Sequence, residues 1–217
     1  MERSIVKTSD GSHTLYAPEI DEHYHSIKGA KSESIHIFIE TGLRHAIETR
    51  HLKDINILEI GFGTGLNAIL TLDFCRRHNC KIKYHTTELY PLDWKSIATL
   101  NITDHPHFEE LHNAPWGKPY EITPLFTINK WHIDARHVDV NEVDVVYLDA
   151  FSPEKQPELW DETFLHKLYN LMSNGGVLTT YCAKGEIRRR LQNIGFIVER
   201  LPGPIGGKRE ILRATKA

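Results

Sequence analysis

The chain has 217 residues, of which 40% are hydrophobic and 25% are charged. This length fits one α/β domain and is too short for a two-domain oxidoreductase, and the composition excludes disordered, collagen-like and disulfide-rich proteins. No run of about 18 apolar residues is present, and residues 1–10 lack the apolar stretch of a signal peptide. Three cysteines, an odd number, fit free thiols in a reducing compartment, so we expect a cytoplasmic protein.

The formal net charge of −3 is unevenly distributed. Residues 181–217 contain nine basic and three acidic side chains, a net +6, so the rest of the chain carries −9. Such asymmetry allows one face to meet a polyanion while the whole molecule stays acidic. On charge alone, a solvated basic helix and strand explain the same residues equally well.

Strand and helix patterns alternate through most of the sequence. Apolar runs and alternating patterns predict strands at 55–60, 81–87, 120–123, 126–133, 143–148, 177–182, 196–199 and 209–214. Helical spacing of apolar residues predicts helices at 34–50, 66–74, 91–100, 160–171 and 184–193. Residues 105–119 carry three prolines and are the least regular stretch, expected as an excursion beside the site.

This alternation predicts a mostly parallel sheet covered by helices on both faces. Only a loop separates the last two strands, so we expect them to form an antiparallel hairpin at the C-terminus. By analogy, the layout is that of the class I, Rossmann-like methyltransferases that use S-adenosylmethionine, for which we predict a seven-stranded sheet. We divide the chain into an N-terminal extension with a leading helix (1–50) and a methyltransferase domain (51–217).

A glycine-rich turn, Gly61-Phe-Gly-Thr-Gly65, joins the first strand of this domain to its helix. Such a turn lets backbone N–H groups approach a ligand closely. Its spacing, with Asn67 after it, differs from the GxGxxG fingerprint that binds a pyrophosphate. Glu59 in the preceding strand would repel a pyrophosphate but attract the ammonium and sulfonium of S-adenosylmethionine. We therefore predict cofactor contacts from Glu59, Gly61, Gly63, Gly65 and Asn67.

Two further acids follow strand ends. Glu88 is placed to accept hydrogen bonds from both ribose hydroxyls, and Asp134 with Ala135 could hold an adenine amino group. Each acid alone is more often a turn former or a cap, but three at successive strand ends around one glycine loop favour a cofactor site. The sequence thus favours S-adenosylmethionine over NAD. Glu33, Ser34 and His36 open the leading helix, where a simple cap is the expected role and covering the cofactor is the alternative.

The most specific stretch follows the fourth strand: Asp149-Ala-Phe-Ser-Pro-Glu-Lys-Gln-Pro-Glu-Leu-Trp160. It resembles the Asp-(Gly/Ala)-Phe-(Ala/Ser)-Pro-x-Lys-Asn-Pro-x-x-Trp signature of the MnmC-type methyltransferases, with Gln156 in place of Asn. Other segments that resemble the family are 24–38, 59–67, 88–92 and 207–211. The resemblance runs from about residue 21 to the C-terminus.

The resemblance implies an enzyme that forms 5-methylaminomethyl groups on the wobble uridine of certain tRNAs by S-adenosylmethionine-dependent N-methylation. We assign Asp149 as the catalytic residue that accepts and aims an N–H of the acceptor amine, the alternative being an Asp that caps the following turn. Phe151 is a candidate for stacking on the base, or a core residue. Candidate contacts to the RNA backbone are Lys155, Lys184, Arg188, Arg189, Lys208 and Arg209.

Alternatives to this function remain open at this stage. Full-length members of the family carry a C-terminal flavin oxidase domain, for which this chain has no length, so we expect methyl transfer only. A small-molecule amine methyl- or aminopropyltransferase is the nearest enzymatic alternative, disfavoured by Ser152, where polyamine synthases have a second Asp. A non-catalytic tRNA-binding module of the same fold is the other alternative. Fourteen histidines, and Cys75, His78 and Cys80 close together, supply no four-ligand set, so we expect no metal.

Overall fold

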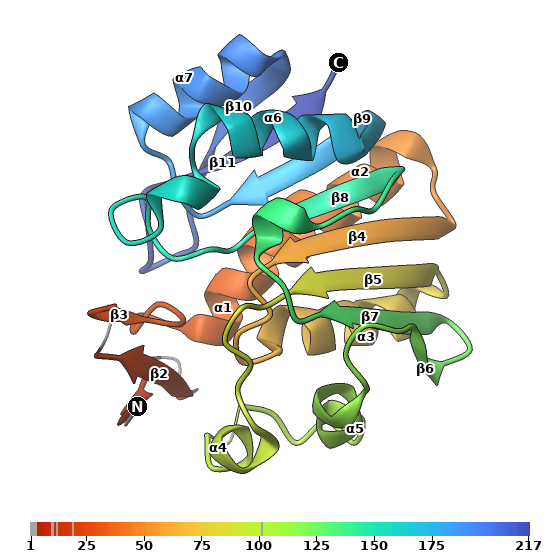
Figure 1. Ribbon diagram of the computed structural model, residues 1–217, viewed down its shortest axis with the longest axis vertical. Helices are drawn as coiled ribbons and strands as arrows, with labels where there is room; N and C mark the ends of the chain where they lie inside the picture. Colours follow the sequence, from red (N-terminus) through yellow and green to blue (C-terminus); the bar gives the residue numbers. More distant parts are fainter. Residues whose placement is uncertain (1–3, 10, 12, 19, 101) are drawn as a thin grey trace.

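The computed structural model describes residues 4–217 except 10, 12, 19 and 101. A central sheet has the strand order β10-β11-β9-β8-β4-β5-β7-β6, and helices lie on both of its faces (Figure 1). The strands are β4 (Asp54–Ile60), β5 (Lys81–Thr87), β6 (Tyr120–Thr123), β7 (Phe126–Trp131), β8 (Val143–Leu148), β9 (Met172–Thr180), β10 (Phe196–Pro202) and β11 (Glu210–Lys216). The predicted mostly parallel α/β sheet is confirmed.

The predicted number of seven strands was wrong, because the sheet has eight. The short edge strand β6 folds back at Pro124 and pairs antiparallel with β7, so it joins the sheet. At the opposite edge, β11 lies between β9 and β10 and is antiparallel to both, which confirms the C-terminal hairpin.

Helices on the two faces enclose separate hydrophobic clusters. One face is covered by α3 (Leu66–His78) and by a continuous helix made of α1 (Ala30–Ser34), η1 (Ile35–Arg44) with wider π-type turns, and α2 (His45–Arg50). The other face is covered by α6 (Glu162–Leu171) and α7 (Gly185–Ile194). The shorter helices are α4 (Trp94–Ala98), α5 (Phe108–Asn113), η2 (Ala135–His137) and η3 (Pro157–Leu159). The stretch 105–119, expected to be irregular, thus contains a helical turn, α5.

Strand β4 alternates between the two clusters. Ile55 and Ile57 belong to the cluster under α3, whereas Leu58 and Ile60 belong to the cluster under α6. By this period of two, Glu59 points toward the α3 side of the sheet. A carboxyl group therefore enters a largely apolar cluster close to the glycine loop.

A second, small sheet precedes the long helix. It consists of β1 (Ser4–Lys7), β2 (His13–Ala17) and β3 (Glu22–His23), paired antiparallel in that order. The Glu22 carboxylate accepts hydrogen bonds from the backbone N (3.2 Å) and Oγ (3.0 Å) of Ser152. This sheet is therefore fastened to the loop that follows β8, on the side where the parallel strands end (Figure 1).

Candidate active site

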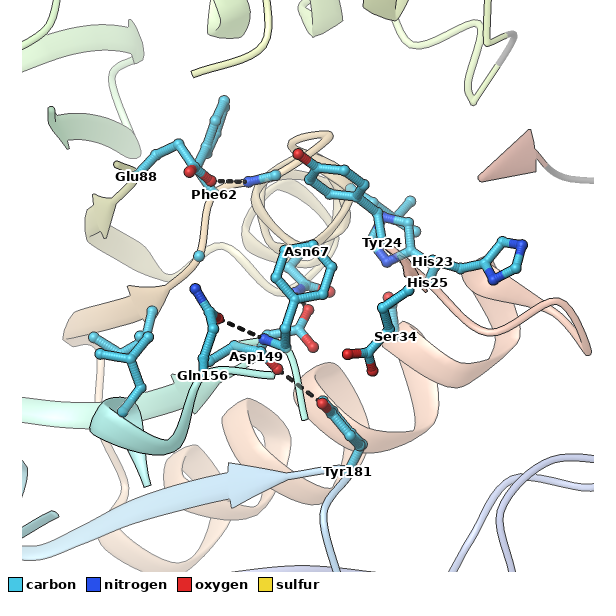
Figure 2. A pocket seen from close by; sticks show the side chains of 18 of the residues that line it. His23, Tyr24, His25, Ser34, Phe62, Asn67, Glu88, Asp149, Gln156 and Tyr181 are labelled. Carbon is cyan, nitrogen blue, oxygen red and sulfur yellow. Dashed lines mark hydrogen bonds between the residues drawn. The ribbon is translucent and has the colours of Figure 1, made fainter. Parts of the chain in front are cut away.

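A cavity of about 650 Å³ opens where β4, β5 and β8 end. The chain continues from β4 to β5 on one side, and from β8 to β9 on the other, so the strand order reverses between β4 and β8. Open α/β sheets bind ligands at such a reversal. Figure 2 shows Asn67 and Asp149 in the middle of the cavity, between Glu88 and Tyr181.

Two of the predicted glycines form the cavity wall. Gly61 and Gly63 have φ angles of +92° and +50°, which favour glycine. A Cβ on Gly61 would lie 3.0 Å from the Asp149 carbonyl oxygen, and one on Gly63 would lie 3.1 Å from the Tyr24 ring. The third, Gly65, begins α3 behind the wall, where a Cβ would lie 2.8 Å from a ring nitrogen of His112. Packing against His112 thus accounts for glycine at this position, and the contact of Gly65 with the cofactor stays a prediction.

Glu88 lies in the cavity wall directly after β5, as the sequence predicted for the ribose acid. Its carboxylate accepts hydrogen bonds from the backbone N–H groups of Gly63 (3.0 Å) and Tyr90 (2.9 Å). These bonds tie the glycine loop to the end of the neighbouring strand. The contact with a ribose stays a prediction.

Asp134 and Ala135 also line the cavity, beyond the end of β7. The Asp134 carboxylate caps the backbone N of Arg136 at 2.9 Å and pairs with its guanidinium at 2.6 Å. Hydrogen bonding to Arg136 lowers the pKa of Asp134. Both carboxylate oxygens are thus engaged by the chain itself, and the predicted contact with an adenine stays a prediction.

Glu59 lies beneath the cavity instead of in its wall. The side chain is fully buried, and its Oε2 accepts a hydrogen bond from Thr86 Oγ1 at 2.7 Å. Burial raises the pKa of Glu59 to about 8, an effect that the Thr86 bond opposes and the nearby Asp149 reinforces. Glu59 does not line the cavity itself, and the contact with the cofactor that we predicted from sequence stays a prediction.

Asp149 follows β8 and occupies the centre of the cavity. Asn67 Nδ2 donates a hydrogen bond to its Oδ2 at 2.8 Å (Figure 2). Burial raises the pKa of Asp149 to about 7, while the Asn67 bond and the charge of Lys208 oppose that rise. A carboxyl group in a cleft whose pKa is close to 7 is typical of a residue that accepts or donates a proton.

The loop after Asp149 is held in shape by two residues of the signature. Gln156 Oε1 accepts a hydrogen bond from the backbone N of Phe151 (2.9 Å), and the buried Trp160 donates its Nε1–H to the Phe151 carbonyl (2.8 Å). Gln at position 156 therefore fixes the loop with its side-chain carbonyl. The Phe151 ring lies in the cavity wall, edge-on to Tyr24 with 5.2 Å between ring centroids.

The predicted basic contacts fall in different places. Lys208 lines the cavity, where burial lowers its pKa and the charges of Glu33 and Asp149 oppose that shift. Lys155 and Arg209 are not part of the cavity wall, and Lys155 pairs with Asp21 at 3.5 Å. Lys184 pairs with Glu154 at the start of α7.

Sequence reasoning did not assign a role to Tyr181 or Glu22, which both line the cavity. Tyr181 directly follows β9, and its hydroxyl donates to the Ala150 carbonyl at 2.8 Å. Its place at a strand end was a usable signal. Glu22 offered no such signal, because only the folded chain brings β3 to the loop after β8.

Within the described part of the chain, no group of three or more His, Cys, Asp or Glu side chains is arranged to hold a metal ion. Cys75, one of the residues considered for metal binding, is buried and donates its S–H to the Cys80 carbonyl. Among the described residues, no helix has both the length and the apolar character needed to cross a membrane.

Comparison with known proteins identifies the family. Residues 125–217 match a family model described as S-adenosyl-L-methionine-dependent methyltransferase. The crystal structure of MnmC2 from Aquifex aeolicus is 30% identical in sequence and superposes with a TM-score of 0.84, over 98% of this chain and 70% of that one. The chain belongs to the MnmC2 methyltransferase family. The recognised resemblance, the class I fold and S-adenosyl-L-methionine as the cofactor are thereby confirmed.

Curated relatives are similar over nearly the whole chain. A protein of Magnetococcus marinus is 31% identical over 93% of the chain, and one of Actinobacillus pleuropneumoniae is 29% identical over 95%. Both are named tRNA 5-methylaminomethyl-2-thiouridine biosynthesis bifunctional protein MnmC. The chain spans about a third of the length of these relatives, 32% and 34%. The crystal structure of a putative class I S-adenosylmethionine-dependent methyltransferase from Listeria monocytogenes supports the fold alone. It is 18% identical in sequence and superposes with a TM-score of 0.53, over 85% of this chain and 59% of that one.

Proposed function

We propose that this methyltransferase acts on the 5-aminomethyl group of a tRNA wobble uridine and converts it to a 5-methylaminomethyl group, with or without 2-thiolation. The names of the curated relatives support tRNA and this nucleoside. The observation that carries the proposal is the presence of Asp149, whose pKa burial raises to about 7, in the same cavity as the Phe151 and Tyr24 rings. A carboxylate can accept a hydrogen bond from an amine, and aromatic side chains in the wall can stack on a nucleobase.

The cavity fits the cofactor that the family uses. Its volume lies within the range of ligand pockets, about 300–1,000 Å³. Gly61 and Gly63 leave space where a Cβ would crowd the wall, and Glu88 supplies carboxylate oxygens for hydroxyl donors. When bound, S-adenosyl-L-methionine supplies a methyl group whose bond to the positively charged sulfur breaks with its electron pair left on sulfur. We propose contacts to it from Gly61, Gly63, Asn67, Glu88, Asp134 and Ala135.

Asp149 has a defined task in this reaction. Only a neutral amine has the lone pair for an in-line displacement, and neutralising an amine with a lysine-like pKa at pH 7 costs about 4–5 kcal/mol. The ionised Asp149 would accept a hydrogen bond from one N–H of the amine. This bond would direct the nitrogen lone pair toward the methyl carbon. The Asn67 bond fixes the carboxylate for this purpose. Positioning supplies most of the rate enhancement, since the acid-base contribution of such a contact is modest.

The aromatic residues have a separate task. Phe151 and Tyr24 stand edge-to-face in the wall beside Asp149. A base turned out of the anticodon loop would stack on such a wall, as single-stranded RNA commonly does on aromatic side chains. Lys155 and Arg209, outside the wall, remain candidates for phosphate contacts.

The function is tested by incubating the chain with S-adenosyl-L-methionine and tRNA that bears 5-aminomethyluridine, followed by nucleoside mass spectrometry. We expect a mass gain of one methyl group on the wobble nucleoside, and none on tRNA with unmodified uridine. Binding of S-adenosylhomocysteine, measured by calorimetry, serves as the control for an intact cofactor site. Binding without methyl gain on the aminomethyl substrate would contradict the proposed acceptor.

A further inference from the structure

Two opposite charges meet on the Tyr181 side of the cavity. Glu33 on α1 and Lys208 on the loop before β11 both line it, and Lys208 Nζ lies 3.8 Å from Glu33 Oε1. The same ammonium lies 3.4 Å from the centroid of the Tyr181 ring, and Figure 2 places Tyr181 across the cavity from Glu88. The Lys208 ammonium thus faces the cavity, although the sequence suggested a contact with the RNA backbone.

One carboxylate oxygen of Glu33 has no hydrogen-bond donor among the described residues. Its side chain is only 13% exposed, and Oε2 is buried and accepts no hydrogen bond from the residues that the structure describes. A buried acceptor without a donor is costly to the folded state. A cavity-lining oxygen of this kind is suited to a donor that arrives with a ligand.

The order of groups along the cavity decides which part of the ligand reaches this end. Glu88, after the second parallel strand of the domain, stands where α/β sheets hold a ribose. Asp149 and Asn67 occupy the middle, beside the glycine loop. A nucleoside bound at Glu88 with its sulfur near Asp149 therefore extends its amino-acid end toward Glu33 and Lys208.

We propose that Glu33 and Lys208 bind the amino-acid end of S-adenosyl-L-methionine, with Glu33 accepting from its α-ammonium and Lys208 donating to its α-carboxylate. This end of the cofactor is a zwitterion, whose two charges sit on one carbon atom. An ion pair of two side chains 3.8 Å apart presents the complementary charges. The inference depends on the cofactor and not on the identity of the methyl acceptor.

The pair has a consequence for selectivity. Decarboxylated S-adenosylmethionine keeps an ammonium but has no carboxylate, so it leaves Lys208 without its partner. Loss of a hydrogen bond to a charged group changes affinity by roughly 10- to 100-fold. The pair therefore selects the methyl donor against the decarboxylated form.

Calorimetry with three probes tests this assignment. S-adenosylhomocysteine has both charged groups, decarboxylated S-adenosylmethionine has the ammonium alone, and 5′-deoxy-5′-methylthioadenosine has neither. The variants are Glu33→Gln, Lys208→Met and the charge-preserving Lys208→Arg. Lys53→Met is the matched control, since Lys53 is exposed directly before β4, at the opposite end of the sheet from the cavity. Thermal unfolding of each variant without ligand reports whether it folds.

We expect Glu33→Gln and Lys208→Met to weaken S-adenosylhomocysteine binding about 10-fold or more, with Lys208→Arg closer to the parent. Methylthioadenosine binding should stay within about twofold in every variant. Lys208→Met should leave the decarboxylated probe unaffected, whereas Glu33→Gln should weaken it. Equal losses for S-adenosylhomocysteine and methylthioadenosine in folded variants would overturn the assignment. Unchanged S-adenosylhomocysteine binding with a raised KM for tRNA would overturn it as well and place the pair at the acceptor.

Discussion

Asn67 affects two acids of the site, the buried Glu59 and the cavity-lining Asp149. Its amide donates to Asp149 at 2.8 Å and also lowers the pKa of Glu59. Burial raises the pKa of both carboxyl groups, and the negative charge of Asp149 raises that of Glu59 further. Asp149, with a pKa of about 7 against about 8 for Glu59, ionises first. The deeper acid therefore favours its neutral form more strongly than the acid in the cavity.

The role of Asp149 predicts a pH dependence of the rate. The carboxylate is the active form, so kcat should rise as pH increases through about 7, where Asp149 loses its proton. Asp149→Asn keeps the shape and the partner Asn67 but cannot ionise. We expect it to lose on the order of 10²-fold in kcat and to lose the rise near pH 7, while S-adenosylhomocysteine binding is retained. Full activity of this variant in the mass-spectrometric assay would exclude the role given to Asp149.

Glu59 predicts a pH dependence of stability with the opposite sign to that of a salt-bridged acid. Its pKa in the folded state, about 8, is above the ordinary value of 4.5, so the folded state binds the proton more tightly. The contribution of Glu59 to the free energy of unfolding should therefore be highest below pH 4.5 and should decline up to about pH 8. Glu59→Gln mimics the neutral acid and should remove part of this decline.

Urea denaturation between pH 5 and pH 9 measures the effect of Glu59→Gln. The matched control is Glu121→Gln on the exposed face of β6, which should leave the pH curve of the parent unchanged. Parallel curves for the parent and Glu59→Gln would show that Glu59 is ionised in the folded protein.

At the scale of secondary-structure elements, the contact between η1 and β9 holds the long helix on the sheet. Gly42 lies in the middle of the helix, where glycine costs about 1 kcal/mol relative to alanine. A Cβ at this position would lie 2.9 Å from Thr179 Oγ1 on β9. The close approach of helix and strand explains why a residue unfavourable for the helix occupies this position.

A double-mutant cycle tests this contact. Gly42→Ala should destabilise the protein by about 1–3 kcal/mol, because overpacking outweighs the gain in helix propensity. In a Thr179→Ala background, which removes Oγ1 and the methyl group, the same change should cost at least about 1 kcal/mol less. Urea denaturation gives both values, and equal costs in the two backgrounds would contradict the steric explanation.

At the scale of the whole molecule, charge divides the chain between its two proposed ligands. The acidic body contains the Glu88 and Asp149 carboxyl groups that line the cavity, suited to a cationic cofactor. The C-terminal +6 segment includes α7, which begins close to the cavity, after Tyr181. Arg188 and Arg189 lie in the first turns of this helix. A tRNA that inserts its wobble base into the cavity would bring backbone phosphates near them.

This division predicts a salt-dependent effect of reversing the charge on α7. Arg188→Glu combined with Arg189→Glu should raise the KM for tRNA and flatten its dependence on salt, by about 0.7–0.9 in the log–log slope for each lost phosphate contact. S-adenosylhomocysteine binding should not change. The control is Lys53→Glu combined with Lys81→Glu, two exposed residues where β4 and β5 begin, at the opposite end of the sheet. Equal effects of the two double variants would show only non-specific attraction.

Much of the fold follows from local patterns. An apolar run such as 143–148 is buried in almost any fold of the chain, so its strand was predictable from the sequence. The helix from residue 34 to Arg50 was predictable from the helical spacing of its apolar residues. The local patterns predicted a strand at 120–123, but the analogy with the methyltransferase fold predicted only seven strands in the sheet. The pairing of β6 with β7 was not predictable, because it depends on the turn at Pro124. The small N-terminal sheet was not predicted either, because its strands are short and are fastened to the rest by Glu22.

The sequence alone determined the chemistry available at the strand ends: the glycine loop, Glu88, and the Asp149-to-Trp160 stretch that points to the family. These are local, because a strand end presents whatever residue follows it. Only the tertiary structure decided which side each group faces. It buried Glu59 beneath the cavity and turned Lys208 toward Glu33, 175 positions earlier in the chain. Contacts between such distant segments depend on how helices and loops pack around the sheet, and that packing is a property of the whole chain.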